Sequence, residues 1–217
     1  SFDDQYDKDA TYPVTSAAEL KNAVANSGKF NVTEDIDVNE TLNVENVGVV
    51  LNAAGKKISN SSDIWNEGKG NWSLVSAKGA NGTSLVIKDG NFEAKANDCF
   101  AVDVQDGASV TIENGTFVGN VHAVYVFEGT AYIKGGFYSI QQKYSDASKA
   151  DEFVLNCYDA NRAAGTAKII VTGGTFVNFN PADCQAEGAH TNFVADGYKV
   201  VSEKQTNGDI WYTVVPA

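Results

Sequence analysis

Hydrophobic and polar positions repeat a short strand-like unit four times along the middle of the chain. Each copy carries two apolar residues two positions apart, then a glycine, then a phenylalanine. The copies are residues 83–92 (TSLVIKDGNF), 108–117 (ASVTIENGTF), 130–137 (TAYIKGGF) and 167–176 (AKIIVTGGTF). Residues two apart on a strand face the same side, so the apolar positions form columns directed into one core. The first such column is Leu85, Val110, Ala131 and Ile169.

The glycine of each copy tolerates the backbone of a tight turn, and the phenylalanine follows that turn. Equivalent positions in successive copies predict that the phenylalanine rings stack as a ladder. Its predicted members are Phe92, Phe117, Phe137 and Phe176.

A second strand lies between the copies, at residues 100–104 (FAVDV), 122–126 (HAVYV) and 153–157 (FVLNC). Val102, Val124 and Leu155 form an inward column, and the residues that follow them, Asp103 and Tyr125 among them, form an outward one. Repeats of 20 to 25 residues with no helix between the strands are typical of a solenoid whose coils lie about 4.8 Å apart. The pattern therefore predicts an all-β fold, a parallel β-helix.

The ends of this predicted solenoid carry signals of their own. Ser16 and Glu19 form a capping box, which predicts a capping helix over about residues 15–28. Coils follow over about 30–195, and Asn207-Gly208 between alternating strands predicts a C-terminal β-hairpin cap over about 198–215. Residues 1–10 read as an acidic leader or linker, and residues 11–217 as a single β-helix domain.

Several of these motifs are similar to those of a known superfamily. The Ile-x-x-Gly-x-Phe unit, the opening helix at residues 15–20 (TSAAEL) and residues 33–37 (TEDID) resemble the pectate-lyase-like superfamily. Residues 173–183 and 191–198 resemble solenoid modules of gut Bacteroidetes surface proteins and of their phages' virion fibres. The resemblance implies a right-handed parallel β-helix, a fold that carries enzymes, adhesins and structural fibres alike.

Charge and hydropathy exclude two classes of partner. The net charge is −12, and Arg162 is the only arginine among 16 basic residues, so no nucleic acid is expected to bind. The sequence has no run of 18 apolar residues, so we expect no membrane insertion in this segment.

The sequence does not predict a catalytic or metal centre. Asp98, Asp103 and Asp106 are the best local set of acids, but the column of Asp103 continues with other residue types, so carboxylates do not accumulate over successive coils. His122 and His190 have no partner at metal-ligand spacing. We therefore expect no catalytic residues, no metal and no cofactor.

Aromatic residues suggest a different kind of site from a catalytic or metal centre, namely a glycan-binding surface. Aromatic faces flanked by carboxylates and amides suit sugar rings, which need a flat apolar platform and hydrogen bonds. The competing interpretation is that these rings fold back to cover coil edges. The candidate glycan-binding residues are Trp65, Trp72, Tyr125, Tyr144, Tyr158 and Asp103.

Together these patterns favour a non-catalytic, extracellular structural or attachment module. The resemblance suggests a phage virion fibre or decoration, or a bacterial surface adhesin, joined to a virion or cell-surface partner through its N-terminal leader. The alternative function is a polysaccharide lyase or glycoside hydrolase that acts on acidic glycans.

Overall fold

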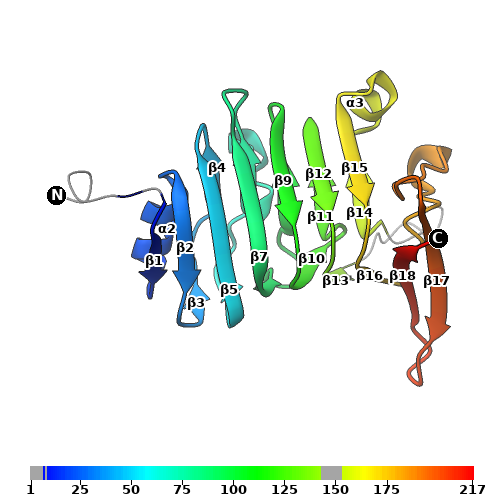
Figure 1. Cartoon of the computed structure of the whole chain (residues 1–217), viewed down its shortest axis with the longest axis horizontal. Helices are drawn as coiled ribbons and strands as arrows, with labels where there is room; N and C mark the ends of the chain where they lie inside the picture. The colour runs from blue at the N-terminus through cyan, green and yellow to red at the C-terminus, as the bar shows by residue number, and fades with distance from the viewer. Residues whose placement is uncertain (1–6, 8, 143–152) are drawn as a thin grey trace.

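A computed structural model describes residues 7, 9–142 and 153–217 of the chain. Most of these residues lie in β-strands, which form one 13-stranded and one 5-stranded sheet. The strands lie side by side along the longest axis, from a helix at the N-terminal end to a hairpin at the C-terminal end (Figure 1). The predicted all-β class with parallel strands is confirmed.

The larger sheet follows the order β1-β2-β5-β7-β10-β13-β16-β18-β17, with β3, β9, β12 and β15 paired alongside this path. Its pairings are parallel except for the two that involve β18. Its strands are β1 Thr11–Val14, β2 Gly28–Val32, β3 Ile36–Asp37, β5 Gly48–Ser59, β7 Ser84–Glu93, β9 Ala108–Ile112, β10 Thr116–Asn120, β12 Gly129–Ile133, β13 Phe137–Gln142, β15 Ala167–Val171, β16 Thr175–Val177, β17 Tyr198–Lys204 and β18 Ile210–Pro216.

The smaller sheet has the order β14-β11-β8-β6-β4, and all its pairings are parallel. Its strands are β4 Leu42–Glu45, β6 Ser73–Lys78, β8 Phe100–Val104, β11 Val124–Val126 and β14 Leu155–Cys157. The helices are α2 Ala17–Val24 and α3 Asp159–Ala164, with short 3-10 turns η1 Glu67–Lys69 and η3 Ala186–Gly188. No helix in the part of the chain that the structure describes is long and apolar enough to span a membrane.

The register of the strands agrees with the columns expected from the repeats. In the larger sheet Leu85 lies opposite Val110, which lies opposite Ala131 on its other side. In the smaller sheet Val124 lies between Val102 and Leu155. All of these side chains are buried. Two-residue alternation therefore directs one face of each of these strands into a common core.

The aromatic ladder exists, but one of its predicted members is wrong. The stacked rings are those of Phe92, Phe117, Tyr138 and Phe176, with successive centroids 5.1, 5.1 and 4.9 Å apart. Phe137 instead lies opposite Thr116 and packs edge-on against Trp211. The cause is visible in the spacing, because Phe137 follows its glycine directly whereas Phe117 follows at two residues. A side chain one position earlier on a strand faces the opposite side.

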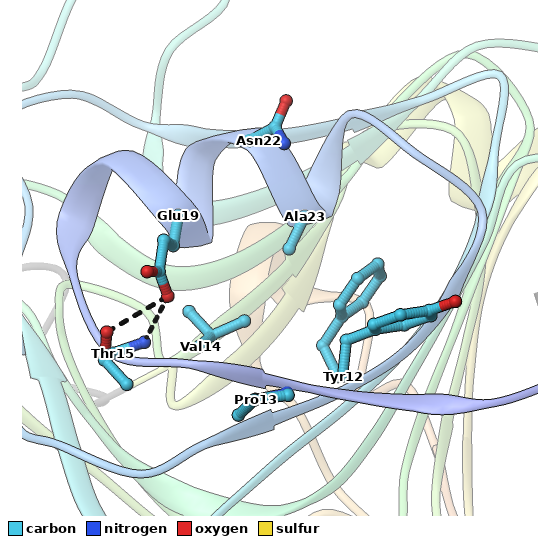
Figure 2. Close-up of a pocket in the computed structure, with 8 residues that line it drawn as sticks. Tyr12, Pro13, Val14, Thr15, Glu19, Asn22 and Ala23 are labelled. Carbon is cyan, nitrogen blue, oxygen red and sulfur yellow. Dashed lines mark hydrogen bonds between the residues drawn. The ribbon is translucent and has the colours of Figure 1, made fainter. Parts of the chain in front are cut away.

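The expected N-terminal helix and C-terminal hairpin are both present. At the start of α2 the Ser16 hydroxyl accepts a hydrogen bond from the Glu19 N–H at 3.2 Å. The Glu19 carboxylate accepts one from the Thr15 N–H at 2.8 Å (Figure 2). The helix ends at Val24, earlier than expected, and buries Leu20. At the other end, β17 and β18 form the antiparallel hairpin, and β18 pairs with β16. Residues 1–6 and 8 of the predicted leader lie outside the described residues.

Candidate functional site

The segment between β5 and β6, residues 60–72, lies against the outer face of the smaller sheet. Asp98, just before β8, accepts hydrogen bonds from Asn60 Nδ2 at 2.6 Å and from the backbone N–H groups of Ile64 and Trp65, both at 3.1 Å. Gln105 Nε2, just after β8, donates to the Gly70 carbonyl at 2.8 Å. Hydrogen bonds with Asp98 and Gln105, which flank β8, therefore fix the position of this segment and of its two tryptophans.

These two tryptophans join four other aromatic rings in a groove over the smaller sheet, with a volume of about 270 Å³. Neighbouring rings lie between 4.8 and 6.3 Å apart, centroid to centroid. His122 and Glu67 complete the lining. We call this the aromatic groove, and its rings are Trp65, Trp72, Phe100, Tyr125, Phe127 and Tyr158.

Exposure differs along the aromatic groove. Trp65 and Tyr158 are each 43% exposed, whereas the rings between them are half-buried. Trp65 packs edge-on against Phe100 at 5.6 Å, and Tyr158 stacks on Phe127 at 4.8 Å. The groove thus offers two accessible rings with further apolar surface between them, an arrangement that suits a flat ligand with apolar faces.

His122 lies below the surface of the groove as a neutral imidazole. It is 4% exposed, and burial lowers its pKa to about 4. Its Nδ1 lies 2.6 Å from the Phe153 carbonyl oxygen, which can only accept, so Nδ1 carries the proton. Its ring stacks on that of Tyr125 at 5.2 Å. The histidine therefore supports the aromatic surface and holds no positive charge at neutral pH.

A polar hollow of about 580 Å³ adjoins the aromatic groove and shares Trp65, Phe100 and His122 with it. Its other side chains include carboxamides and carboxylates that can hydrogen-bond to hydroxyl groups. Asp63 forms an ion pair with Lys95 at 2.8 Å, and this hydrogen bond raises the pKa of Lys95. The polar residues of the hollow are Asp63, Asn97, Asp98, Asn120 and Gln142.

Asp103 is not part of this accessible surface. Its side chain leaves the strand on the outer face, in the same row as Tyr125, as expected. Asp103 is nevertheless completely buried, and its Oδ2 accepts a hydrogen bond from Gln105 Nε2 at 2.5 Å. The same Nε2 donates to the Gly70 carbonyl, in the segment of residues 60–72. Burial raises the pKa of the Asp103 carboxyl to about 6. A direct contact between Asp103 and a surface ligand, which the sequence suggested, does not fit this burial.

The structure brings together four of the predicted residues, namely Trp65, Trp72, Tyr125 and Tyr158. Tyr144 lies outside the described residues. Sequence reasoning missed Phe100 and Phe127 as members of the groove. The sequence did contain a pattern that could have identified Phe100, because Phe100 and His122 occupy equivalent positions at the start of the second strand of their repeats.

A separate apolar pocket of about 310 Å³ lies between α2 and β1 (Figure 2). It is bordered by Val14, Ala23 and the rings of Tyr12 and Phe30, whose centroids are 6.3 Å apart. Its single carboxylate, Glu19, already accepts two hydrogen bonds from Thr15. We assign this pocket to the packing of α2 against β1 and β2.

Among the described residues, no group of three or more His, Cys, Asp or Glu side chains could hold a metal ion. Comparisons with protein-family models, with curated proteins and with solved structures found no match to this chain. The aromatic groove is therefore the feature from which we infer a function.

Proposed function

We propose that this chain is a right-handed parallel β-helix that serves as a non-catalytic, extracellular glycan-binding module, with the aromatic groove as its binding site. The succession of strands supports the solenoid. The chain passes from β9 and β10 to β11 in the other sheet, returns to β12 and β13, and crosses again to β14. Ladder rings 4.9 to 5.1 Å apart match the spacing of about 4.8 Å between stacked strands.

The observation that carries glycan binding is the convergence of Trp65 and Tyr158 on one groove, both substantially exposed. Large exposed aromatic side chains gathered in one place are typical of binding surfaces. Sugar rings present apolar C–H faces and peripheral hydroxyl groups. The exposed rings would stack against the former, and the side-chain carboxamides of Asn97 and Gln142 in the polar hollow would hydrogen-bond with the latter.

Binding is favoured over hydrolysis because the acids of this region have other roles. Glycosidases use two carboxyl groups about 5 to 9.5 Å apart, both facing the substrate. Asp103 is completely buried, and Asp98 already accepts three hydrogen bonds that position Trp65. Asp63 is paired with Lys95. A lyase or hydrolase that acts on acidic glycans therefore remains the less favoured function.

The two capped ends support a module displayed on a surface. A helix at one end and an antiparallel hairpin at the other cover the terminal strands, which would otherwise offer edges for end-to-end growth. This architecture fits attachment to a virion or to a bacterial cell surface through the N-terminal segment.

Screening on a glycan array, with two tryptophan variants, tests the proposal. The protein is expected to bind a subset of glycans, and Trp65→Ala should weaken that binding about tenfold or more, as for a central aromatic contact. Trp211→Ala removes another exposed tryptophan, on the C-terminal hairpin and outside the groove, and should leave binding unchanged. Equal binding by the Trp65 variant, or release of shortened or unsaturated sugars, would overturn the proposal.

A further inference from the structure

We propose that the aromatic groove selects glycans with free, protonated amino groups over N-acetylated, neutral and acidic ones. This inference rests on the proposed glycan-binding function and specifies its ligand class. It comes from the combination of aromatic rings and acidic side chains in one connected hollow.

All the charged side chains that line the aromatic groove and the polar hollow have the same sign. Within the described residues, the charged side chains that border the aromatic groove and the polar hollow are Glu67, Asp63 and Asp98. Of the basic residues around them, Lys95 pairs with Asp63, Arg162 pairs with Asp159, and the Lys78 ammonium donates to the Gly70 carbonyl. A bound ammonium group would therefore meet the carboxylate of Glu67, whereas a bound carboxylate would meet no Lys or Arg among the described side chains that line these two spaces.

The rings themselves also favour a cation. The face of an aromatic ring carries negative electrostatic potential, and tryptophan attracts cations more strongly than tyrosine or phenylalanine does. Trp65 and Trp72 both line the groove, together with Tyr125 and Tyr158. Glu67 borders the same space, so an amino group on a stacked sugar could approach an aromatic face and a carboxylate at once.

His122 does not oppose this preference. A protonated imidazole below the rings would repel an ammonium group, but burial keeps the pKa of His122 at about 4. The imidazole is therefore neutral under mildly acidic conditions in which amino sugars carry a proton. The net charge of −12 acts in the same direction over a longer range, because it attracts cationic ligands and repels uronic acids.

The test compares chitosan oligosaccharides with fully N-acetylated oligosaccharides of equal length, by isothermal titration calorimetry under mildly acidic, low-salt conditions. We expect the free amines to strengthen binding about tenfold, an advantage that falls as salt is added. Glu67→Gln should reduce this advantage. Asp196→Asn makes the same change of charge at an exposed position outside the groove and should preserve the advantage.

Two results would overturn the inference. One is equal affinity for the two oligosaccharides, with the binding of each weakened by Trp65→Ala. That result would contradict the amine preference but would still support the proposed glycan-binding function. The other is an amine preference that persists undiminished in Trp65→Ala, which would reduce it to attraction by the overall charge. If no glycan bound at all, the proposed function would fail as well.

Discussion

The ring of Tyr138 lies parallel to that of Phe117, with centroids 5.1 Å apart and planes at 9°. Tyr138 is completely buried, and its hydroxyl donates a hydrogen bond to the Gly135 carbonyl at 2.6 Å. A tyrosine thus occupies the third rung of a ladder that is otherwise phenylalanine, and its polar atom is satisfied within the turn that precedes it.

Tyr138→Ala should therefore destabilise the protein by about 3 to 5 kcal/mol, because it opens a cavity between two stacked rings. Phe137→Ala is the matched control, since Phe137 is the adjacent residue and lies only partly buried against Trp211. We expect the control to cost clearly less in the free energy of unfolding, measured by chemical denaturation. If Phe137→Ala lowered the free energy of unfolding more than Tyr138→Ala, Phe137 would be the member of the ladder, as its sequence repeat suggested.

The three hydrogen bonds accepted by Asp98 predict a local effect on the segment that carries Trp65. Asp98→Ala should cost about 1 to 3 kcal/mol, because it removes a charged acceptor from partly buried donors. Hydrogen exchange at the amides of Ile64 and Trp65 should become faster, and glycan binding weaker.

Asp63→Ala is the control for that change, because it removes a carboxylate that borders the same hollow. Asp63 forms an exposed ion pair with Lys95, which solvent screening makes a small contributor to the free energy of unfolding. If exchange at Ile64 and Trp65 responded equally to both substitutions, Asp98 would not be the anchor of this segment.

The carboxyl group of Asp103 makes the free energy of unfolding depend on pH, in a direction that its raised pKa defines. Burial raises the pKa of this carboxyl from 3.8 to about 6, so the folded state holds the proton more tightly than the unfolded state. The stabilisation is complete below the unfolded pKa and is lost as the pH rises through about 6, amounting to about 3 kcal/mol. Asp103→Asn should remove this loss.

His122 acts in the opposite direction over nearly the same range. Burial lowers its pKa from 6.5 to about 4, so its contribution is present above pH 6.5 and is lost as the pH falls through about 4. The effects of Asp103 and His122 on the free energy of unfolding partly cancel in the native protein. The informative quantity is therefore the difference in unfolding free energy between the native protein and the Asp103→Asn variant. That difference in unfolding free energy should shift in favour of the variant between pH 4 and about 7; a constant difference would contradict a raised pKa at Asp103.

The strand columns could be predicted from the sequence because they depend only on two-residue alternation. Val102 and Val124 lie where that rule places them. The third rung of the ladder was misassigned because similarity between repeats outweighed the spacing from the glycine. Counting from Gly136 rather than matching phenylalanines identifies Tyr138, since Gly115 precedes Phe117 by the same two residues.

The groove could be predicted only in part. Trp65 and Trp72 were recognisable as loop aromatics, but their meeting with Tyr125 depends on where residues 60–72 fold. That position is set by contacts such as the one between Asn60 and Asp98, 38 residues apart in the chain. The burial of Asp103 was missed for a related reason, because alternation places a side chain on the outer face of a sheet but does not show what covers that face.

The most direct test of glycan binding in the aromatic groove uses the indole N–H signals of the three tryptophans in NMR spectra. Titration with a glycan selected on the array should shift the signals of Trp65 and Trp72 and leave that of Trp211, on the C-terminal hairpin, unchanged. A saturating glycan that shifted Trp211 alone, or none of the three, would contradict the placement of the binding site in the groove.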